Sequence, residues 1–211
     1  CHSPNVGEPA VPQAPEQLAA LRARLDIPSD AYVVVGVGRL IAKKGFSDLI
    51  AAFAQISPTL HDRPTHLVIV GAGEQLPQLQ TQARQLAVAG RVHWAGWQDD
   101  PAPFYAMADV FVCPSLHEPL GNVILEAWAH GVAVVSTETH GARELIEDNV
   151  NGVLAPCSNP TQLAHRIQHV LRDESARTNL GAAGAHKLDA EFSRPAIVTR
   201  YVELYRQLRR A

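Results

Sequence analysis

Residues 32–46 read YVVVGVGRLIAKKGF and join a strand pattern to a loop that carries cations. Tyr32 to Val37 is a continuous apolar run rich in β-branched residues, which is typical of a strand buried on both faces of a parallel sheet. After Gly38 the loop is short, and Phe46 to Ile56 places its apolar side chains on one face of a helix. The stretch therefore predicts the first strand, loop and helix of an α/β unit.

The same alternation continues on both sides of this stretch. It predicts a doubly wound, mostly parallel Rossmann-like sheet with helices on both faces. Further strands are expected at His66 to Val70, Arg91 to Trp94, Val110 to Cys113 and Val132 to Ser136. Helices are expected over Glu16 to Leu25 and Glu74 to Val88, from Pro101, from Gly121, and through most of the chain beyond Asn159.

The two ends of the chain differ from its middle. The proline-spaced residues 1–15, which begin with Cys rather than Met, are expected to be the remnant of an interdomain linker in a longer protein. Residues 16–194 are expected to form the Rossmann-like domain. Residues 195–211 are expected to form a helix with an apolar face, which should pack either on this domain or toward an absent one.

Charge and cysteine content exclude several classes of protein. With 18 Lys and Arg against 21 Asp and Glu, the net charge of -3 lacks the basic footprint of nucleic-acid binding. Cys1, Cys113 and Cys157 are odd in number and widely spaced, so neither a disulfide framework nor a zinc site is expected, and a reducing cytoplasm fits. No apolar run approaches the ~20 residues of a membrane-spanning helix.

The loop after the first predicted strand is suited to phosphate. Arg39 and Lys44 lie five residues apart, just ahead of a helix start, where two fixed cations would suit a diphosphate; the alternative is that they are solvated surface charges. The Gly36-x-Gly38 pair suggests a dinucleotide site. However, Ile41 replaces the third glycine of that motif and the second strand ends in Gly71 rather than an acid, which argues against nicotinamide binding.

Two other loops follow predicted strands. Gly71-Ala72-Gly73 allows either a tight turn or the close approach of a ligand, so Gly73, like Gly38 after the first strand, is a candidate donor-binding residue. Gln98, with Trp97, is a candidate for lining a base pocket, although Trp94 and Trp97 fit a core or interdomain position equally well. Asp99 and Asp100 precede Pro101 at a capped helix start, so no metal site is predicted there.

The segment HEPLGNVILEAWAHG, residues 117–131, carries the strongest signal. Glu118 lies in the loop after a strand, and Glu126 lies inside the next helix with its side chain leaning back toward the helix start. The amides of Gly121, Asn122 and Val123 are unpaired donors at the same end. Amides suit phosphate oxygens and carboxylates suit sugar hydroxyls, so the segment predicts a site for a sugar nucleotide. The alternative is an ordinary loop charge and helix residue. His117 is left without a role.

Together these segments resemble the donor-binding domain of the retaining GT-B glycosyltransferases, the family of sucrose synthase, bacterial mannosyltransferases and lipopolysaccharide core glycosyltransferases. Five blocks carry the resemblance in order, from GRLIAKKGF through LVIVGAGEQLPQLQ, VHWAGWQDDPAPFYAMADVFVCPSLHEPLGNVILEAWAHG and VAVVSTETHGARELIEDNVNGVLAP to the terminal helices. The resemblance implies that Arg39 and Lys44 contact the donor diphosphate, Glu118 the donor sugar and Glu126 the ribose. It also implies that the backbone of Leu120, Gly121, Asn122 and Val123 lies near the phosphates.

One loop departs from the family pattern, since Glu118-Pro119-Leu120-Gly121 stands where Glu-Gly-Phe-Gly is common, which is expected to alter sugar selection. The implied reaction is retaining transfer from a UDP-, GDP- or ADP-sugar to a hydroxyl acceptor, without metal or cofactor, in lipopolysaccharide or other surface-glycan synthesis. The acceptor, a glycan or glycolipid, would bind a missing N-terminal domain, which would also supply any peripheral contact with the inner face of the membrane. The alternatives are a non-catalytic nucleotide-sugar-binding module, or a GT-B epimerase or phosphorylase.

Overall fold

The computed structural model describes residues 12–209, without the side chain of Leu204. In this part of the chain a seven-stranded sheet runs in the order β2-β3-β1-β5-β6-β7, and β4 pairs with β3. All pairings are parallel except the short antiparallel pair of β2 and β3. The strands are β1 (Tyr32–Val37), β2 (Thr59–Leu60), β3 (Arg63–Val70), β4 (Val92–Gly96), β5 (Val110–Cys113), β6 (Ala133–Thr137) and β7 (Val153–Ala155).

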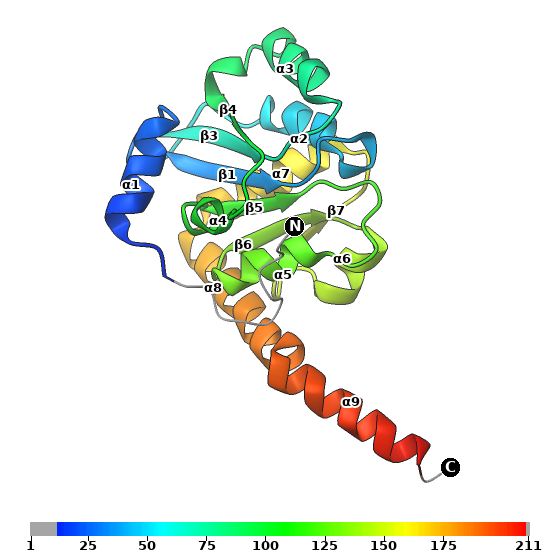
Figure 1. The fold of residues 1–211 in the computed structure, drawn as a ribbon. Helices are drawn as coiled ribbons and strands as arrows, with labels where there is room; N and C mark the ends of the chain where they lie inside the picture. The colour runs from blue at the N-terminus through cyan, green and yellow to red at the C-terminus, as the bar shows by residue number, and fades with distance from the viewer. Residues whose placement is uncertain (1–11, 210–211) are drawn as a thin grey trace.

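Helices cover both faces of this sheet (Figure 1). They are α1 (Pro15–Arg24), α2 (Phe46–Phe53), α3 (Leu76–Gln85), α4 (Ala102–Ala106), α5 (Asn122–Ala129), α6 (His140–Leu145), α7 (Pro160–Arg172), α8 (Glu174–Lys187) and α9 (Arg194–Leu208). One apolar cluster joins α2, α3 and α7 to the sheet, and a second joins α1, α4, α5 and α6 to its other face. The predicted doubly wound fold is confirmed.

The first strand shows why the pattern was informative. Val34 packs into the first cluster, whereas Val33 and Val35 pack into the second. Successive side chains of a strand point to opposite faces, so a strand covered on both sides requires an unbroken apolar run. The bounds of β1 and of β5 are those predicted.

Three of the strands and helices named above were not predicted. Strands β2 and β7 have only two and three residues, and α6 has six. Helix α6 lies in the polar stretch THGARELIEDN, residues 139–149, which has little apolar periodicity. Elements this short are positioned by their neighbours in the fold rather than by a local pattern.

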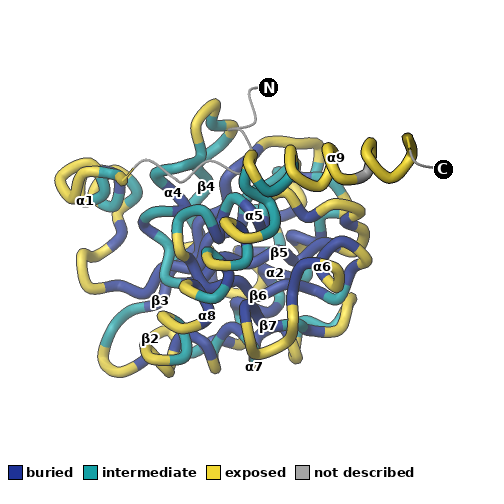
Figure 2. Tube along the Cα trace, turned by 90° about the horizontal axis from the view of Figure 1, so that it is seen from below, coloured by how far each residue is buried: buried dark blue, intermediate teal, exposed yellow. Residues whose placement is uncertain are grey.

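Helix α9 extends away from the body of the domain (Figure 1), and most of its surface is exposed (Figure 2). Its exposed large apolar side chains are Val198, Tyr201, Val202, Tyr205 and Leu208. Of the predicted linker, residues 1–11 lie outside the described residues, and α1 already begins at Pro15.

The strand order creates a topological switch point. From β1 the chain moves outward through β3 to β4, and then returns to the other side of β1 to build β5, β6 and β7. In open α/β sheets, the crevice between the two strands that flank such a reversal is where ligands bind, at the carboxyl ends. Here those strands are β1 and β5, which carry the two most informative loops of the sequence.

Candidate functional site

The loops that follow β1 and β5 are joined by backbone contacts. The amides of Leu116 and His117 both donate to the carbonyl of Lys43, at N···O distances of 2.9 and 3.3 Å. Gly45 has a φ of +67°, and a Cβ there would lie 1.9 Å from the carbonyl oxygen of Pro114. Only glycine permits both the left-handed conformation and this close approach. The two loops therefore form one surface at the switch point.

Lys44 and Glu118 meet on that surface. Lys44 Nζ forms an ion pair and hydrogen bond with Glu118 Oε2, and the two side chains are only 17% and 11% exposed. Burial shields such a pair from solvent screening. An ammonium group has three donors and a carboxylate has two acceptor oxygens, so each partner keeps capacity for a ligand. The two predicted residues from opposite halves of the sheet are thus brought into contact.

Polar side chains behind this pair hold the β5 loop in place. Ser115 Oγ lies 3.5 Å from Glu118 Oε2. Thr137 Oγ1, at the end of β6, donates to the carbonyl oxygens of Ser115 and Cys113, and Ser136 Oγ also donates to Cys113, at 3.2 Å. Sequence reasoning missed these residues. The signal that could have found them is that hydroxyl side chains stand at the end of β6 and two residues beyond the end of β5.

Helix α5 starts beside the same loop. Gly121 precedes it with a φ of +69°, and no side chain caps the helix. The first amides of a helix lack intrahelical acceptors, so the backbone at Asn122 and Val123 keeps the donor character that the sequence predicted. A Cβ on Gly121 would lie 2.9 Å from Leu145 Cδ1, the end of a side chain that can shift, so the left-handed φ is the main reason for glycine there. Leu120, immediately before it, is exposed.

Glu126 makes a different contact from Glu118. Tyr105 Oη donates to Glu126 Oε2 at 2.8 Å. Burial raises the pKa of Glu126, while the hydrogen bond from Tyr105 acts in the opposite direction. Among the described residues, Lys44 forms an ion pair with Glu118 but not with Glu126. The two predicted glutamates therefore have different partners.

Arg39 lies on the β1 loop with its side chain exposed, and it has no ion-pair or hydrogen-bond partner among residues 12–209. An unpaired guanidinium at the carboxyl edge of the sheet is free to bind an anion. An exposed Arg39 is also what the alternative from the sequence, a solvated surface charge, predicts. The position of Arg39 is therefore consistent with either interpretation.

The glycines around the β1 and β3 loops are needed for backbone packing. The amide of Gly38 donates to the Val70 carbonyl at 3.0 Å, and a Cβ on Gly71 would lie 1.9 Å from the Gly38 carbonyl oxygen. A Cβ on Gly73 would lie 2.4 Å from the carbonyl oxygen of Leu40. These contacts account for Gly71 and Gly73 within the protein itself, and a ligand role for Gly38 and Gly73 stays a prediction.

The loop after β4 is held by its own side chains. Gln98 Nε2 donates to the carbonyl of Ala95 at 2.7 Å, and Trp97 Nε1 donates to Asp99 Oδ1 at 3.1 Å. Trp97 is exposed, whereas Trp94 packs against the core. Of the two tryptophans, Trp97 is therefore the more accessible to a ligand or another domain, since Trp94 is partly buried.

The acidic pair at this loop has local partners. Asp100 Oδ1 accepts from the amide of Ala102 at 3.0 Å, as an N-terminal aspartate should, but α4 begins at Ala102 with Pro101 as its N-cap, one residue later than predicted. Asp99 accepts from Trp97. In the described part of the chain, no group of three or more His, Cys, Asp or Glu side chains gathers in a way that could hold a metal ion.

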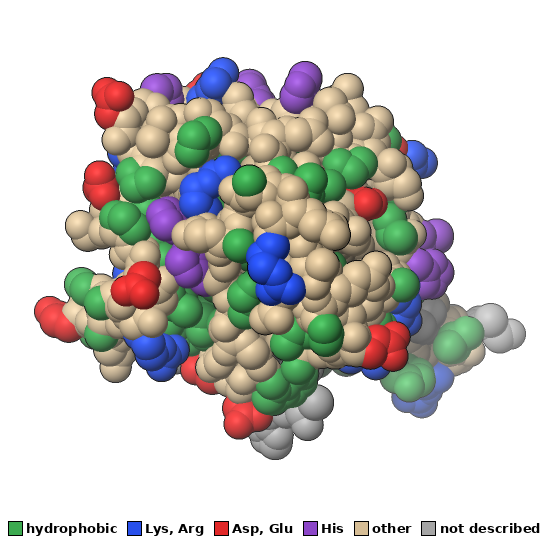
Figure 3. Space-filling view, turned by 90° about the horizontal axis from the view of Figure 1, so that it is seen from above, with side chains coloured by type: hydrophobic (Ala, Val, Ile, Leu, Met, Phe, Trp, Pro, Cys, Tyr) green, Lys and Arg blue, Asp and Glu red, His purple; other side chains and the backbone are tan. Residues whose placement is uncertain are grey.

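Charges of both signs are scattered over the face shown in Figure 3, without a continuous basic patch. This distribution matches the net charge of -3. No helix within residues 12–209 is long and apolar enough to cross a membrane.

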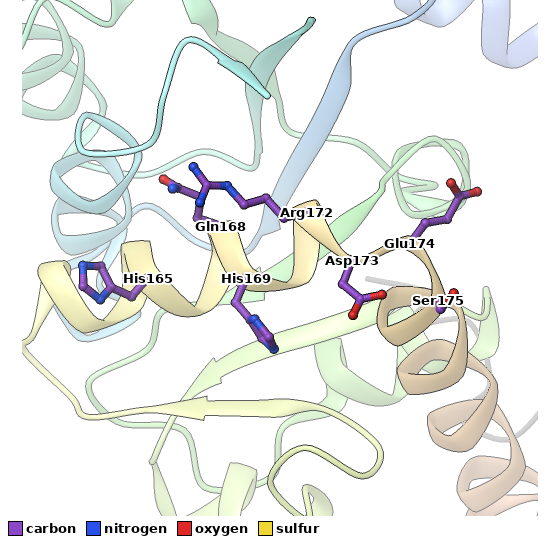
Figure 4. A pocket seen from close by; sticks show the side chains of 7 residues that line it. All are labelled: His165, Gln168, His169, Arg172, Asp173, Glu174 and Ser175. Carbon is purple, nitrogen blue, oxygen red and sulfur yellow. The ribbon is translucent and has the colours of Figure 1, made fainter. Parts of the chain in front are cut away.

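A hollow of about 630 Å³ lies where α7 meets α8 (Figure 4). Its side chains, which include His165, His169 and Arg172, point in different directions and do not converge on one point. A helix that follows a parallel strand runs back along the sheet, so the end of α7 lies toward the amino ends of the strands. This hollow is lined by none of the predicted site residues.

Comparison with known proteins identifies relatives of this domain. The profile described as "Glycosyl transferases group 1" matches residues 19–187. The lipopolysaccharide core biosynthesis glycosyltransferase LpsE of Rhizobium meliloti is 43% identical over 187 residues, which are 89% of this chain and 53% of LpsE. LpsD of the same organism is 34% identical over 184 residues, covering 87% of this chain and 52% of LpsD.

Solved structures agree with these matches. The crystal structure of Anabaena Alr3699/HepE in complex with UDP superposes with a TM-score of 0.83 at 27% identity, covering 92% of this chain and 54% of HepE. HepE has also been solved in complex with UDP-glucose. The chain thus spans about half the length of the relatives that it matches.

Proposed function

Because this chain belongs to the glycosyl transferases group 1 family, we propose that it is the donor-binding half of a retaining GT-B glycosyltransferase. The observation that carries the proposal is the contact of Lys44 with Glu118 at the crevice between β1 and β5. A cation and a carboxylate held side by side suit a ligand that contains both phosphates and neutral hydroxyls. A nucleoside diphosphate sugar is such a ligand.

In the proposed reaction, the bond between the sugar and the diphosphate lengthens and negative charge builds on the diphosphate. Lys44 and Arg39, with the amides at the start of α5, stabilise that charge. Lys44 is already oriented by Glu118 before the donor binds, so little reorganisation is needed. Glu118 uses its second oxygen to accept hydrogen bonds from the hydroxyls of the donor sugar.

The comparisons support a narrower proposal for the donor and the acceptor. HepE binds UDP and UDP-glucose, which supports UDP as the first nucleotide to test, with GDP and ADP as alternatives. LpsE and LpsD act in lipopolysaccharide core biosynthesis, which supports a surface glycan or glycolipid as acceptor. We place acceptor binding in an N-terminal domain, and without that domain we expect no transfer.

The exposed face of α9 has a place in this proposal. Tyr201, Tyr205 and Leu208 are large apolar side chains with no cover in the described residues. Aromatic and aliphatic side chains exposed together on one helix are typical of an interaction surface. We propose that α9 packs toward the acceptor-binding domain.

Calorimetric titration of the 211-residue chain with UDP, GDP, ADP and their common sugar conjugates tests the proposal. Lys44→Ala should abolish binding of the preferred nucleotide, and Glu126→Ala should weaken it. Lys43→Ala is a matched control, because Lys43 is exposed and adjacent in sequence. Equal losses in Lys43→Ala and Lys44→Ala would contradict a specific diphosphate contact.

A further inference from the structure

Tyr105 is held rigidly beside helix α5, next to Glu126. It lies on α4 with its side chain buried, only 1% exposed. Its ring centroid is 5.2 Å from that of Phe111 on β5, and 5.7 Å from that of His130, on which it stacks at an interplanar angle of 15°. A ring enclosed on both sides keeps one orientation, so its hydroxyl group is fixed as well.

That hydroxyl is directed at Glu126. Tyr105 Oη donates to Glu126 Oε2 at 2.8 Å, and Oε2 is the only Glu126 oxygen for which a partner is described. A buried tyrosine hydroxyl requires a hydrogen-bond acceptor, and many acceptors in a core would serve. Here the acceptor is a carboxylate whose pKa is raised by burial, so the contact also favours the charged form of Glu126.

The second oxygen of Glu126 keeps its acceptor capacity. Within residues 12–209, Thr139 Oγ1 is the only fully buried side-chain nitrogen or oxygen atom without a hydrogen-bond partner. Glu126 Oε1 also has no described partner, so it is not fully buried and a ligand can reach it. Glu126 lies about one turn inside α5, and helical side chains lean toward the helix start. With Oε2 bound to Tyr105, Oε1 is the oxygen of Glu126 that remains for a ligand.

We infer that Tyr105 is a positioning residue, which holds one oxygen of Glu126 so that the other accepts hydrogen bonds from the ribose hydroxyls of the bound nucleotide. This inference rests on the proposed donor-binding function. A carboxylate repels phosphate but accepts from neutral hydroxyls, so the ribose that the family resemblance implies for Glu126 suits it chemically. A carboxylate fixed before binding also loses less conformational entropy when the ligand arrives.

The test compares nucleotides with and without ribose hydroxyls. The chain and Tyr105→Phe are titrated with UDP, GDP and ADP and with the 2′,3′-dideoxy counterpart of whichever binds. Tyr105→Phe should weaken the ribose nucleotide about five- to tenfold, as expected for one lost orienting hydrogen bond, and should change the dideoxy nucleotide less than about twofold. In a Glu126→Gln background, Tyr105→Phe should have no further effect.

Tyr32→Phe is the matched control. Tyr32 is also a buried tyrosine, on β1, but its hydroxyl has no described hydrogen bond to Glu126. It should bind both nucleotides as the unmodified chain does. If Tyr105→Phe weakens both nucleotides equally, the hydroxyl has a structural role only and the inference is overturned. Unchanged binding of the ribose nucleotide overturns it as well.

A second measurement does not depend on a ligand. The titratable groups around the Tyr105 ring are Glu126, Cys113, His130 and, next to His130, Asp100. Carbon-13 NMR of the Glu126 carboxyl separates its titration from the others. Tyr105→Phe should raise the pKa of Glu126 further, because it removes the hydrogen bond that favours the charged form. An unchanged pKa contradicts the inferred contact.

The two proposals can fail separately. If the folded chain binds no nucleoside diphosphate, both the donor-binding function and the role of Tyr105 are refuted. If it binds one and Tyr105→Phe makes no hydroxyl-dependent difference, only the role of Tyr105 is refuted.

Discussion

Replacing Gly45 by alanine should separate the two loops that form the site. Gly45 combines a φ of +67° with an approach to the Pro114 carbonyl that would leave a Cβ only 1.9 Å from that oxygen. Left-handed backbone costs an L-residue about 1–2 kcal/mol. Forcing extra atoms into a packed contact costs about 1–3 kcal/mol more. We therefore expect Gly45→Ala to lower the free energy of unfolding by about 2–5 kcal/mol.

Gly131 provides the control for backbone strain. Its φ is +66°, nearly that of Gly45, but a Cβ there would have no heavy atom within 4 Å. Gly131→Ala should thus show only the cost of the left-handed conformation, about 1–2 kcal/mol. The difference between the two variants isolates the steric contact of the β1 and β5 loops.

Urea unfolding followed by far-ultraviolet circular dichroism measures both variants. Gly45→Ala should also weaken nucleotide binding, because Lys44 and Glu118 lie on the two loops that would move apart. The reasoning is refuted if Gly45→Ala costs no more than Gly131→Ala. It is also refuted if Gly45→Ala is strongly destabilised but binds the preferred nucleotide with unchanged affinity.

Three other expectations concern stability and use the same unfolding assay. Burial, together with the nearby His93, Arg91 and Arg22, lowers the pKa of His66 from 6.5 to about 4, so below pH 6.5 the unfolded chain binds a proton that the folded chain does not. The free energy of unfolding should fall as the pH drops from 6.5 toward 4, by up to about 2 kcal/mol at pH 5. It should fall less steeply in His66→Asn, and equal pH dependence in the two proteins would contradict this expectation. Asn159 Oδ1 accepts from the Gln162 amide at 3.0 Å as the cap of α7, so Asn159→Ala should cost about 1 kcal/mol while Asn159→Asp retains stability; an equal cost would exclude a capping role. Thr139 Oγ1 is buried without a partner among the described residues, so Thr139→Val should stabilise the fold by about 1 kcal/mol, and a loss of stability would mean that the hydroxyl is hydrogen-bonded in solution.

The site was only partly predictable because its contacts join distant parts of the chain. Lys44 and Glu118 were each identified from a loop after a strand, but 74 residues separate them, and only the pairing of β1 with β5 brings them together. Tyr105 and Glu126 are 21 residues apart. In the sequence Tyr105 is an ordinary apolar-helix aromatic, since no local pattern distinguishes a tyrosine that contacts a carboxylate from one that only fills the core.

The sequence by itself determined the sheet and the edge at which a ligand would bind. Unbroken apolar runs such as Tyr32–Val37 and Val110–Cys113 require cover on both faces, and such strands alternating with helices leave few other folds. The tertiary structure alone decided the chemistry at that edge: which carboxylate pairs with Lys44, which is held by Tyr105, and why Gly45 must be glycine. Burial patterns are local along the chain, whereas hydrogen bonds and steric contacts depend on distances that exist only once the chain has folded.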